Sequence, residues 1–112
     1  STDIKEDFQI AARLLNLVIH YQLGNHDHLS SVLNSSAHFI SKKEHSFRFE
    51  KVFVSFIRKK LLDTHQKKEL FQAFSELKKE LDIIAKNPYE KKALENFDFI
   101  SWVEEKVREY EN

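Results

Sequence analysis

The chain has very few turn-forming residues and no cysteine. Among its 112 residues there is one glycine, Gly24, and one proline, Pro88. A β-sheet protein needs turn residues at each hairpin, so this scarcity argues against a β fold. Without cysteine there can be no disulfide, zinc–cysteine site or cysteine nucleophile. The lack of cysteine also fits a reducing compartment, and we expect a cytoplasmic protein.

Long apolar segments and an excess of one charge are also missing. No apolar run approaches the roughly 20 residues of a membrane span, so we expect no membrane contact. The 18 Lys and Arg residues balance the 18 Asp and Glu residues, which removes the simplest argument for nucleic-acid binding. The chain begins STDIKEDF, without methionine. We expect a single domain, residues 1–112, from the C-terminal part of a longer protein.

Helical periodicity dominates what is present, beginning with the segment 3–23. A stripe at i, i+3 and i+4 spacing predicts its buried face. The residues of this stripe are Phe8, Ala11, Ala12, Leu15, Val18, Ile19 and Gln22. Gly24 follows where a left-handed residue often ends a helix, and Asp27 is the expected N-cap of a second helix.

Three further start signals divide the rest of the chain. Ser41 to Glu44 has the spacing of a capping box, and Ser46 is a competing start for the third helix. This helix has apolar residues on more than one side, which predicts a central position in the fold. A fourth helix follows the break near Thr64, with its core stripe at Leu70, Phe74, Leu77, Leu81 and Ile84. Pro88 suits the first position of the last segment, which is one helix or two, broken near Asp98.

These signals predict an all-α fold of five or six helices. All connections are short, so neighbouring helices are expected to be antiparallel hairpins. The hairpins can form either a right-handed superhelix, like that of helical-repeat proteins, or a compact bundle.

The run HYQLGNHDHLSSVLNSSAHFI resembles a tetratricopeptide (TPR) hairpin. Its Tyr21, Gly24, Asn25, Leu29 and Leu33 match that motif in character. The match covers residues 10–41, and Arg13 stands where the motif has an aromatic residue. The final run ALENFDFISWVEEKV resembles the end of uncharacterised bacterial helical-repeat proteins. The resemblance implies a scaffold that binds a protein or peptide partner, without catalysis or a cofactor.

Three histidines surround the glycine turn, and they raise the question of a metal site. His20, His26 and His28 supply imidazoles, but a zinc or nickel site needs three or four converging ligands. Turn and capping chemistry accounts for the segment without a metal. We therefore expect a hairpin corner and no bound metal.

Arg13 and His20 suggest an alternative, because their spacing resembles the R-x4–6-H element of HEPN ribonucleases. Residues seven apart share a helix face, so the pair could act together on a phosphate. Leu14 stands where that element has a polar residue. An RNase is the third interpretation, after a scaffold and a nucleic-acid-associated domain.

The nucleic-acid interpretation depends on the basic region 58–68. Residues 42–79 contain eleven Lys or Arg against five Asp or Glu, and residues 80–112 contain five against nine. Lysines in the first turn of a helix are disfavoured by its dipole, so those near residue 67 have no capping role. The candidate interaction patch is Arg58, Lys59, Lys60, Lys67 and Lys68.

Overall fold

The structure is a computed structural model that describes residues 2–111, and the side chains of residues 4–111. Over this range the protein is all-α, as predicted. Six α-helices and one π-helical turn follow one another: α1 (Thr2–Leu23), α2 (His26–Ser41), α3 (Arg48–Phe56), η1 (Ile57–Leu61), α4 (Lys67–Ile84), α5 (Pro88–Leu94) and α6 (Phe99–Tyr110).

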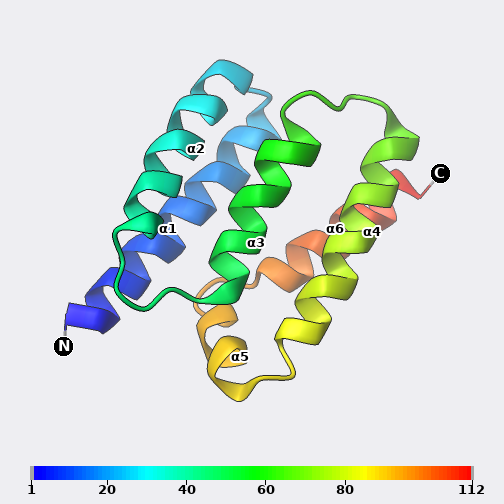
Figure 1. The fold of residues 1–112 in the computed structure, drawn as a ribbon. Helices are drawn as coiled ribbons and strands as arrows, with labels where there is room; N and C mark the ends of the chain where they lie inside the picture. The colour runs from blue at the N-terminus through cyan, green and yellow to red at the C-terminus, as the bar shows by residue number, and fades with distance from the viewer. Residues whose placement is uncertain (1, 112) are drawn as a thin grey trace.

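The helices form a compact, flattened bundle. Its principal extents are 45 × 32 × 18 Å, and the radius of gyration is 13.6 Å. In the view of Figure 1, α2, α3 and α4 lie in front, while α1 and α6 lie behind them. The most extensive helix–helix contacts are those between α1 and α2 and between α4 and α6. The central position predicted for the third helix is confirmed, since α3 contacts α1, α2, α4 and α5.

The buried face of α1 differs from the prediction. Of the predicted stripe only Val18 is buried, whereas Phe8 is 59% and Ile19 45% exposed, and the other buried residues of the helix are Ile10, Leu14 and Leu17. The helix is apolar on two opposite sides. Periodicity reveals both sides, but only the packing of α2 and α3 selects one of them.

The turn after α1 was predicted correctly at its glycine. Gly24 has φ +73°, a left-handed conformation. The N–H of Asn25 donates to the carbonyl of His20 at 3.1 Å, and that of Gly24 donates to Tyr21 at 3.1 Å. This is the Schellman pattern of helix termination. The next N-cap is Asn25, however, and Asp27 lies within the first turn of α2.

The start of α3 was placed too early. The helix begins at Arg48, after an extended Phe47, so the Ser41–Glu44 box does not start it, and the competing start at Ser46 lies one residue before the observed N-cap. Lys43 is instead drawn into the interior, where its ammonium pairs with two carboxylates. Lys43 thus lies in the connection between α2 and α3, and its partner Glu50 lies in the first turn of α3.

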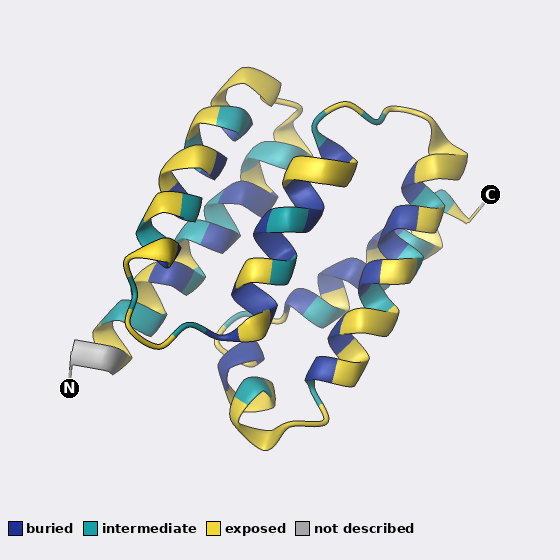
Figure 2. Cartoon of the chain, in the orientation of Figure 1, coloured by how far each residue is buried: buried dark blue, intermediate teal, exposed yellow. Residues whose placement is uncertain are grey.

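The C-terminal half follows the prediction closely. All five predicted core residues of α4 are buried, and Figure 2 shows a buried and an exposed side on both α3 and α4. Pro88 opens α5, with Asn87 as its N-cap. The last segment is two helices, and the carboxylate of Asp98 caps the second by accepting the N–H of Ser101 at 3.0 Å. Within the described residues, no helix combines the length and apolarity that crossing a membrane requires.

Candidate functional site

A groove runs between α3 and α4 and continues along η1. It consists of two adjoining hollows of about 300 and 280 Å³. Lys59, Lys60, Ala73 and Glu76 line both hollows, which makes the two continuous. The remaining lining residues are Lys51, Val52, Ser55, Phe56, Leu77 and Glu80 in the first hollow and Thr64, Glu69 and Gln72 in the second.

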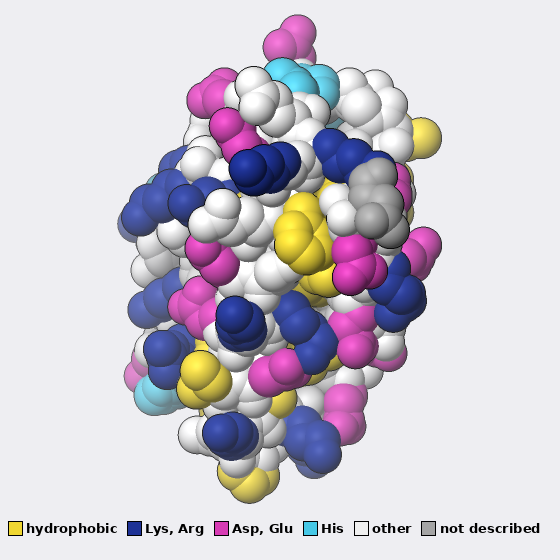
Figure 3. All heavy atoms as spheres, turned by 90° about the vertical axis from the view of Figure 1, so that its right-hand side faces the viewer, with side chains coloured by type: hydrophobic (Ala, Val, Ile, Leu, Met, Phe, Trp, Pro, Cys, Tyr) yellow, Lys and Arg dark blue, Asp and Glu magenta, His cyan; other side chains and the backbone are white. Residues whose placement is uncertain are grey.

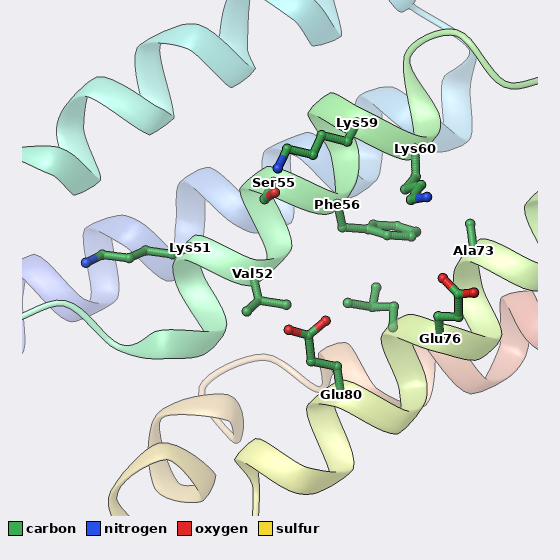
Figure 4. A pocket seen from close by; sticks show the side chains of 10 residues that line it. Lys51, Val52, Ser55, Phe56, Lys59, Lys60, Ala73, Glu76 and Glu80 are labelled. Atoms are coloured by element: carbon green, nitrogen blue, oxygen red, sulfur yellow. The ribbon is translucent and has the colours of Figure 1, made fainter.

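The floor of this α3–α4 groove is apolar. Val52 and Phe56 of α3 meet Ala73 and Leu77 of α4, and Figure 4 shows Val52 and Phe56 directed into the space between the helices. The Phe56 ring packs edge-on against Phe74, with ring centroids 5.0 Å apart. The floor is therefore held by the core, and we expect it to change little when a partner binds.

The two sides of the groove carry opposite charges. Lys51, Lys59 and Lys60 belong to the α3–η1 side, and Glu76 and Glu80 belong to α4. In Figure 4, Glu80 points toward Val52, and Lys59 extends along the rim of α3. Among the described residues, none of these five charged groups forms an ion pair within 4.0 Å. Glu76 accepts a hydrogen bond from Nε2 of Gln72 at 3.3 Å but keeps its charge, so the five charges can interact with a bound molecule.

A π-helical turn, which the sequence analysis did not predict, positions the lysines. The N–H of Leu62 donates to the carbonyl of Ile57 at 3.2 Å, five residues back. Ile57 and Leu61 are buried at the ends of this turn, while Lys59 and Lys60 between them are exposed. Such turns are rare, occur mostly within α-helices, and are frequent at functional sites. The only sequence signal is three consecutive basic residues between buried aliphatic ones.

The predicted basic patch is divided between several environments. Lys59 and Lys60 line the groove, and the guanidinium of Arg58 instead donates to Oδ1 of Asn34 at 3.3 Å. Lys67 and Lys68 are exposed in the first turn of α4, outside the set of residues that line the groove.

Tertiary packing also mixes the charges that the sequence separates. Lys78 of the basic stretch pairs with Asp82 and lies 4.0 Å from Glu104, which belongs to the acidic C-terminal stretch. Figure 3 shows basic and acidic side chains interspersed over the face at the right of Figure 1. This face therefore presents no broad surface of a single charge sign.

Four of the six histidines form two pairs. The rings of His20 and His28 meet with centroids 4.2 Å apart, and those of His26 and His65 with centroids 5.3 Å apart. The side-chain amide of Asn25 lies 3.4 Å from Nδ1 of His20. In the part of the chain that the structure describes, no group of three or more histidine or carboxylate side chains is arranged to hold a metal ion.

Arg13 and His20 have different partners. The guanidinium of Arg13 lies 4.4 Å from the centre of the Phe39 ring and donates to Oγ of Ser35 at 3.2 Å. His20 faces His28 instead. Each side chain is thus directed at a neighbour on α2, and the two hollows that Arg13 lines do not include His20.

A buried ion cluster lies beside the start of α3. The ammonium of Lys43 is 2.5 Å from Asp7 and 3.3 Å from Glu50, and the side chains of Lys43 and Glu50 are only 3% and 2% exposed. Burial raises the pKa of Glu50, although the Phe47 N–H and the Lys43 ammonium favour its charged form. Burial alone would lower the pKa of Lys43, but Asp7 and Glu50 outweigh it and raise the pKa. The cluster joins α1 to α3 and serves the fold.

A second buried polar group joins α1 to α6. Lys106 is buried and donates to Glu109 at 2.7 Å, with the Tyr21 ring 5.8 Å from its ammonium. The hydroxyls of Tyr21 and Tyr110 are 3.2 Å apart. Burial, together with this hydrogen bond, raises the pKa of Tyr21. Tyr21 therefore stays neutral and serves the packing of α1 on α6.

Of the features described, the α3–α4 groove is the strongest candidate for a binding site.

Comparison with models of protein families, with curated proteins and with solved structures finds no match to this chain.

Proposed function

We propose that the protein is a non-catalytic interaction module that binds an amphipathic helix of a partner protein in the α3–α4 groove. The observation that supports this most directly is the apolar floor between a lysine side and a glutamate side. Val52 is half-buried, and Phe56 and Leu77 are only 7% and 2% exposed, so a helix with one apolar stripe would lay that stripe mainly on Val52 and the edge of Phe56, a recurrent mode of peptide recognition. The TPR resemblance suggests the same class of function.

The charges of the groove specify the partner further. A bound helix would place acidic residues beside Lys59 and Lys60, and basic residues beside Glu76 and Glu80. Charge pairs at the rim of an interface contribute more to orientation and association rate than to affinity. The floor exposes little apolar surface, so the apolar stripe contributes a modest part of the binding energy, and the charges select the direction in which the helix lies.

A designed peptide pair tests this proposal. One labelled amphipathic helix carries glutamates along one edge of its apolar stripe and lysines along the other, and its control carries lysines along both edges. We expect fluorescence anisotropy to show tighter binding of the first peptide by about tenfold or more, with a preference that weakens as salt increases. Equal binding of the two peptides would argue against a role for the charged sides.

Variants of the groove link the preference to named residues. Reversing the lysine side alone, with Lys59→Glu and Lys60→Glu, leaves both sides acidic and should make the peptide with lysines on both edges the tighter binder. The matched control is Lys67→Glu with Lys68→Glu, which reverses the same type of charge outside the groove. If the control changes peptide preference as strongly as the groove variant, the binding site lies elsewhere.

The alternative is a nucleic-acid-associated domain that uses region 58–68. The exposure of its basic side chains supports it, but Glu76 lies in the same hollow as Lys59 and Lys60 and would repel phosphates. Oligonucleotide binding with a steep salt dependence, lost in the Lys67→Glu, Lys68→Glu variant, would favour this alternative. We further propose that the protein acts in the cytoplasm, since its sequence lacks cysteine.

A further inference from the structure

Among the side chains that the structure describes, six large apolar ones are exposed, and four of these lie on one face of α1. They are Ile4 (59% exposed), Phe8 (59%), Ile19 (45%) and Leu23 (65%). Ala12, which is exposed, and Leu15, which is half-buried, continue the same face. We call these six residues the outer stripe of α1. It lies opposite the side that packs on α2 and α3, where Ile10, Leu14 and Leu17 are buried.

The outer stripe has a palindromic spacing. Its residues are separated by 4, 4, 3, 4 and 4 positions. When two copies of α1 are laid antiparallel, Ile4 therefore faces Leu23, Phe8 faces Ile19, and Ala12 faces Leu15, each pair occurring twice. An interface between two identical chains about a twofold axis requires this kind of self-complementarity.

The surface relief at the centre of the stripe suits such a pairing. A shallow hollow of about 530 Å³ lies there, lined by Gln9, Ala12, Arg13, Leu15, Asn16, Ile19 and Phe39. The small side chain of Ala12 contributes to this hollow, and in the antiparallel pair Leu15 of the second copy would lie opposite it. A large residue would then fill the space beside a small one, as in knobs-into-holes packing.

Charge and area are compatible with a pair of copies. No member of the stripe is charged, and Asp7 and Arg13 are directed at Lys43 and Phe39 of their own chain. Two like charges are therefore not forced together at the centre. The helix has 22 residues and is about 33 Å long. Joining two such faces would bury on the order of 1,000 Å² in total, near the lower limit for a specific interface.

We propose that the outer stripe of α1 is a homodimer interface in which two copies of α1 pack antiparallel. Because the area is small, the dimer is expected to dissociate at micromolar concentrations. This interface lies on another part of the molecule from the α3–α4 groove, so the two proposals can fail independently.

Sedimentation velocity over a range of concentrations tests the dimer. The wild-type chain should show a reversible monomer–dimer equilibrium, and Ile19→Lys or Phe8→Lys should raise the dissociation constant at least tenfold. The matched control is Ile83→Lys, which places the same charge at an exposed isoleucine of α4. Wild-type chain that stays monomeric up to several hundred micromolar would overturn the proposal, as would dimers that tolerate Ile19→Lys but not Ile83→Lys.

Cross-linking tests the antiparallel direction, because the chain has no cysteine of its own. A mixture of the Phe8→Cys and Ile19→Cys variants should form a disulfide-linked heterodimer under mild oxidation. Each variant alone should not, since residue 8 of one copy would lie about 16 Å along the axis from residue 8 of the other. Efficient linkage of Phe8→Cys to itself would indicate parallel helices and contradict the proposal.

Discussion

The carboxylate of Glu90 accepts a hydrogen bond from the backbone N–H of Arg48 at 2.8 Å, so a residue of α5 caps the start of α3. Its second oxygen accepts the N–H of Phe49 at 3.1 Å. These are two of the N–H groups that a helix leaves without an internal partner. A negative charge is also favoured there by the helix dipole. One side chain thus joins two segments that are 42 residues apart in sequence.

Replacing Glu90 with alanine should destabilise the protein by about 1–2 kcal/mol, because both N–H groups lose a charged acceptor. Glu90→Gln should cost less, since the amide oxygen can still accept one hydrogen bond. Urea unfolding measures both changes. The control is Glu105→Ala, an exposed glutamate of α6. Equal stability of the Glu90→Ala and Glu105→Ala variants would show that the cap contributes nothing.

Lys43→Met should be among the most damaging single substitutions, with a loss of about 3–5 kcal/mol, because it leaves the Glu50 carboxylate buried without its cation. The double variant Lys43→Met, Glu50→Gln should be more stable than Lys43→Met alone. Its amide oxygen can still accept the N–H of Phe47, which Oε1 of Glu50 accepts at 3.0 Å. A double variant that is less stable than the single one would contradict this account.

The loss in Lys43→Met should also depend on pH. The pKa of Glu50 is already raised by burial, and a folded state with a raised carboxyl pKa loses stability as pH rises through that pKa. The deficit of Lys43→Met relative to wild type should therefore be complete at neutral pH and shrink as pH falls through the raised pKa of Glu50. Urea midpoints at several pH values measure it. A deficit that grows on acidification would rule out an unpaired Glu50 as its cause.

Asp98 caps α6, and its removal should destabilise the protein by about 1 kcal/mol in Asp98→Ala. Hydrogen bonds from the hydroxyl and N–H of Ser101 lower the pKa of Asp98. A carboxylate with a lowered pKa stabilises the fold above its ordinary pKa, and this contribution is lost as pH falls through the lowered value. Asp98→Asn keeps an N-cap that does not titrate.

The wild-type protein should consequently have a larger free energy of unfolding than the Asp98→Asn variant. This difference should be largest above about pH 4 and disappear in more acidic solution. Thermal unfolding of both proteins across this range provides the measurement. A difference that is independent of pH would mean that the carboxylate charge has no part in capping α6.

Ser36→Ala should stabilise the protein by about 1 kcal/mol, because the mutation removes a buried hydroxyl that has no partner. Ser36 is 0% exposed in α2, and its Oγ lacks a hydrogen-bond partner among the described residues. Ser35→Ala is the control, since Oγ of Ser35 accepts a bond from Arg13 at the surface. Denaturant unfolding that shows Ser36→Ala to be clearly less stable than wild type would disprove the inference.

Gly24→Ala should cost roughly 1 kcal/mol through backbone strain alone, because φ is +73° there. A Cβ at this position would meet no atom within 4 Å, so no steric clash adds to the cost. Gly24→Asn should cost less, since asparagine adopts the left-handed conformation more readily than alanine. In thermal unfolding, the Gly24→Asn variant should have a higher melting temperature than the Gly24→Ala variant. The reverse order would exclude strain as the main effect.

A local sequence signal predicts a helix and its buried face correctly when only one structure fits that signal. The stripe of α4 is apolar on one side only, so its buried residues follow directly from periodicity. Asn87 and Pro88 begin α5, and Asp98 begins α6, because side-chain capping and the fixed φ of proline act within a few residues. Gly24 ends α1 for the same reason, since its left-handed conformation is a local preference.

Packing decided the features that depend on distant residues. The sequence of α1 allows two apolar faces, and the choice of the inner one comes from α2 and α3. The ion pair of Lys43 with Asp7 and the cap of Glu90 on Arg48 join segments whose proximity no local pattern encodes. The α3–α4 groove arises because η1 turns Lys59 and Lys60 outward opposite Glu76. The sequence by itself determined an all-α chain and most helix ends, because propensity and capping are local. Only the tertiary structure decided which surfaces remain exposed for binding, because burial depends on the whole fold.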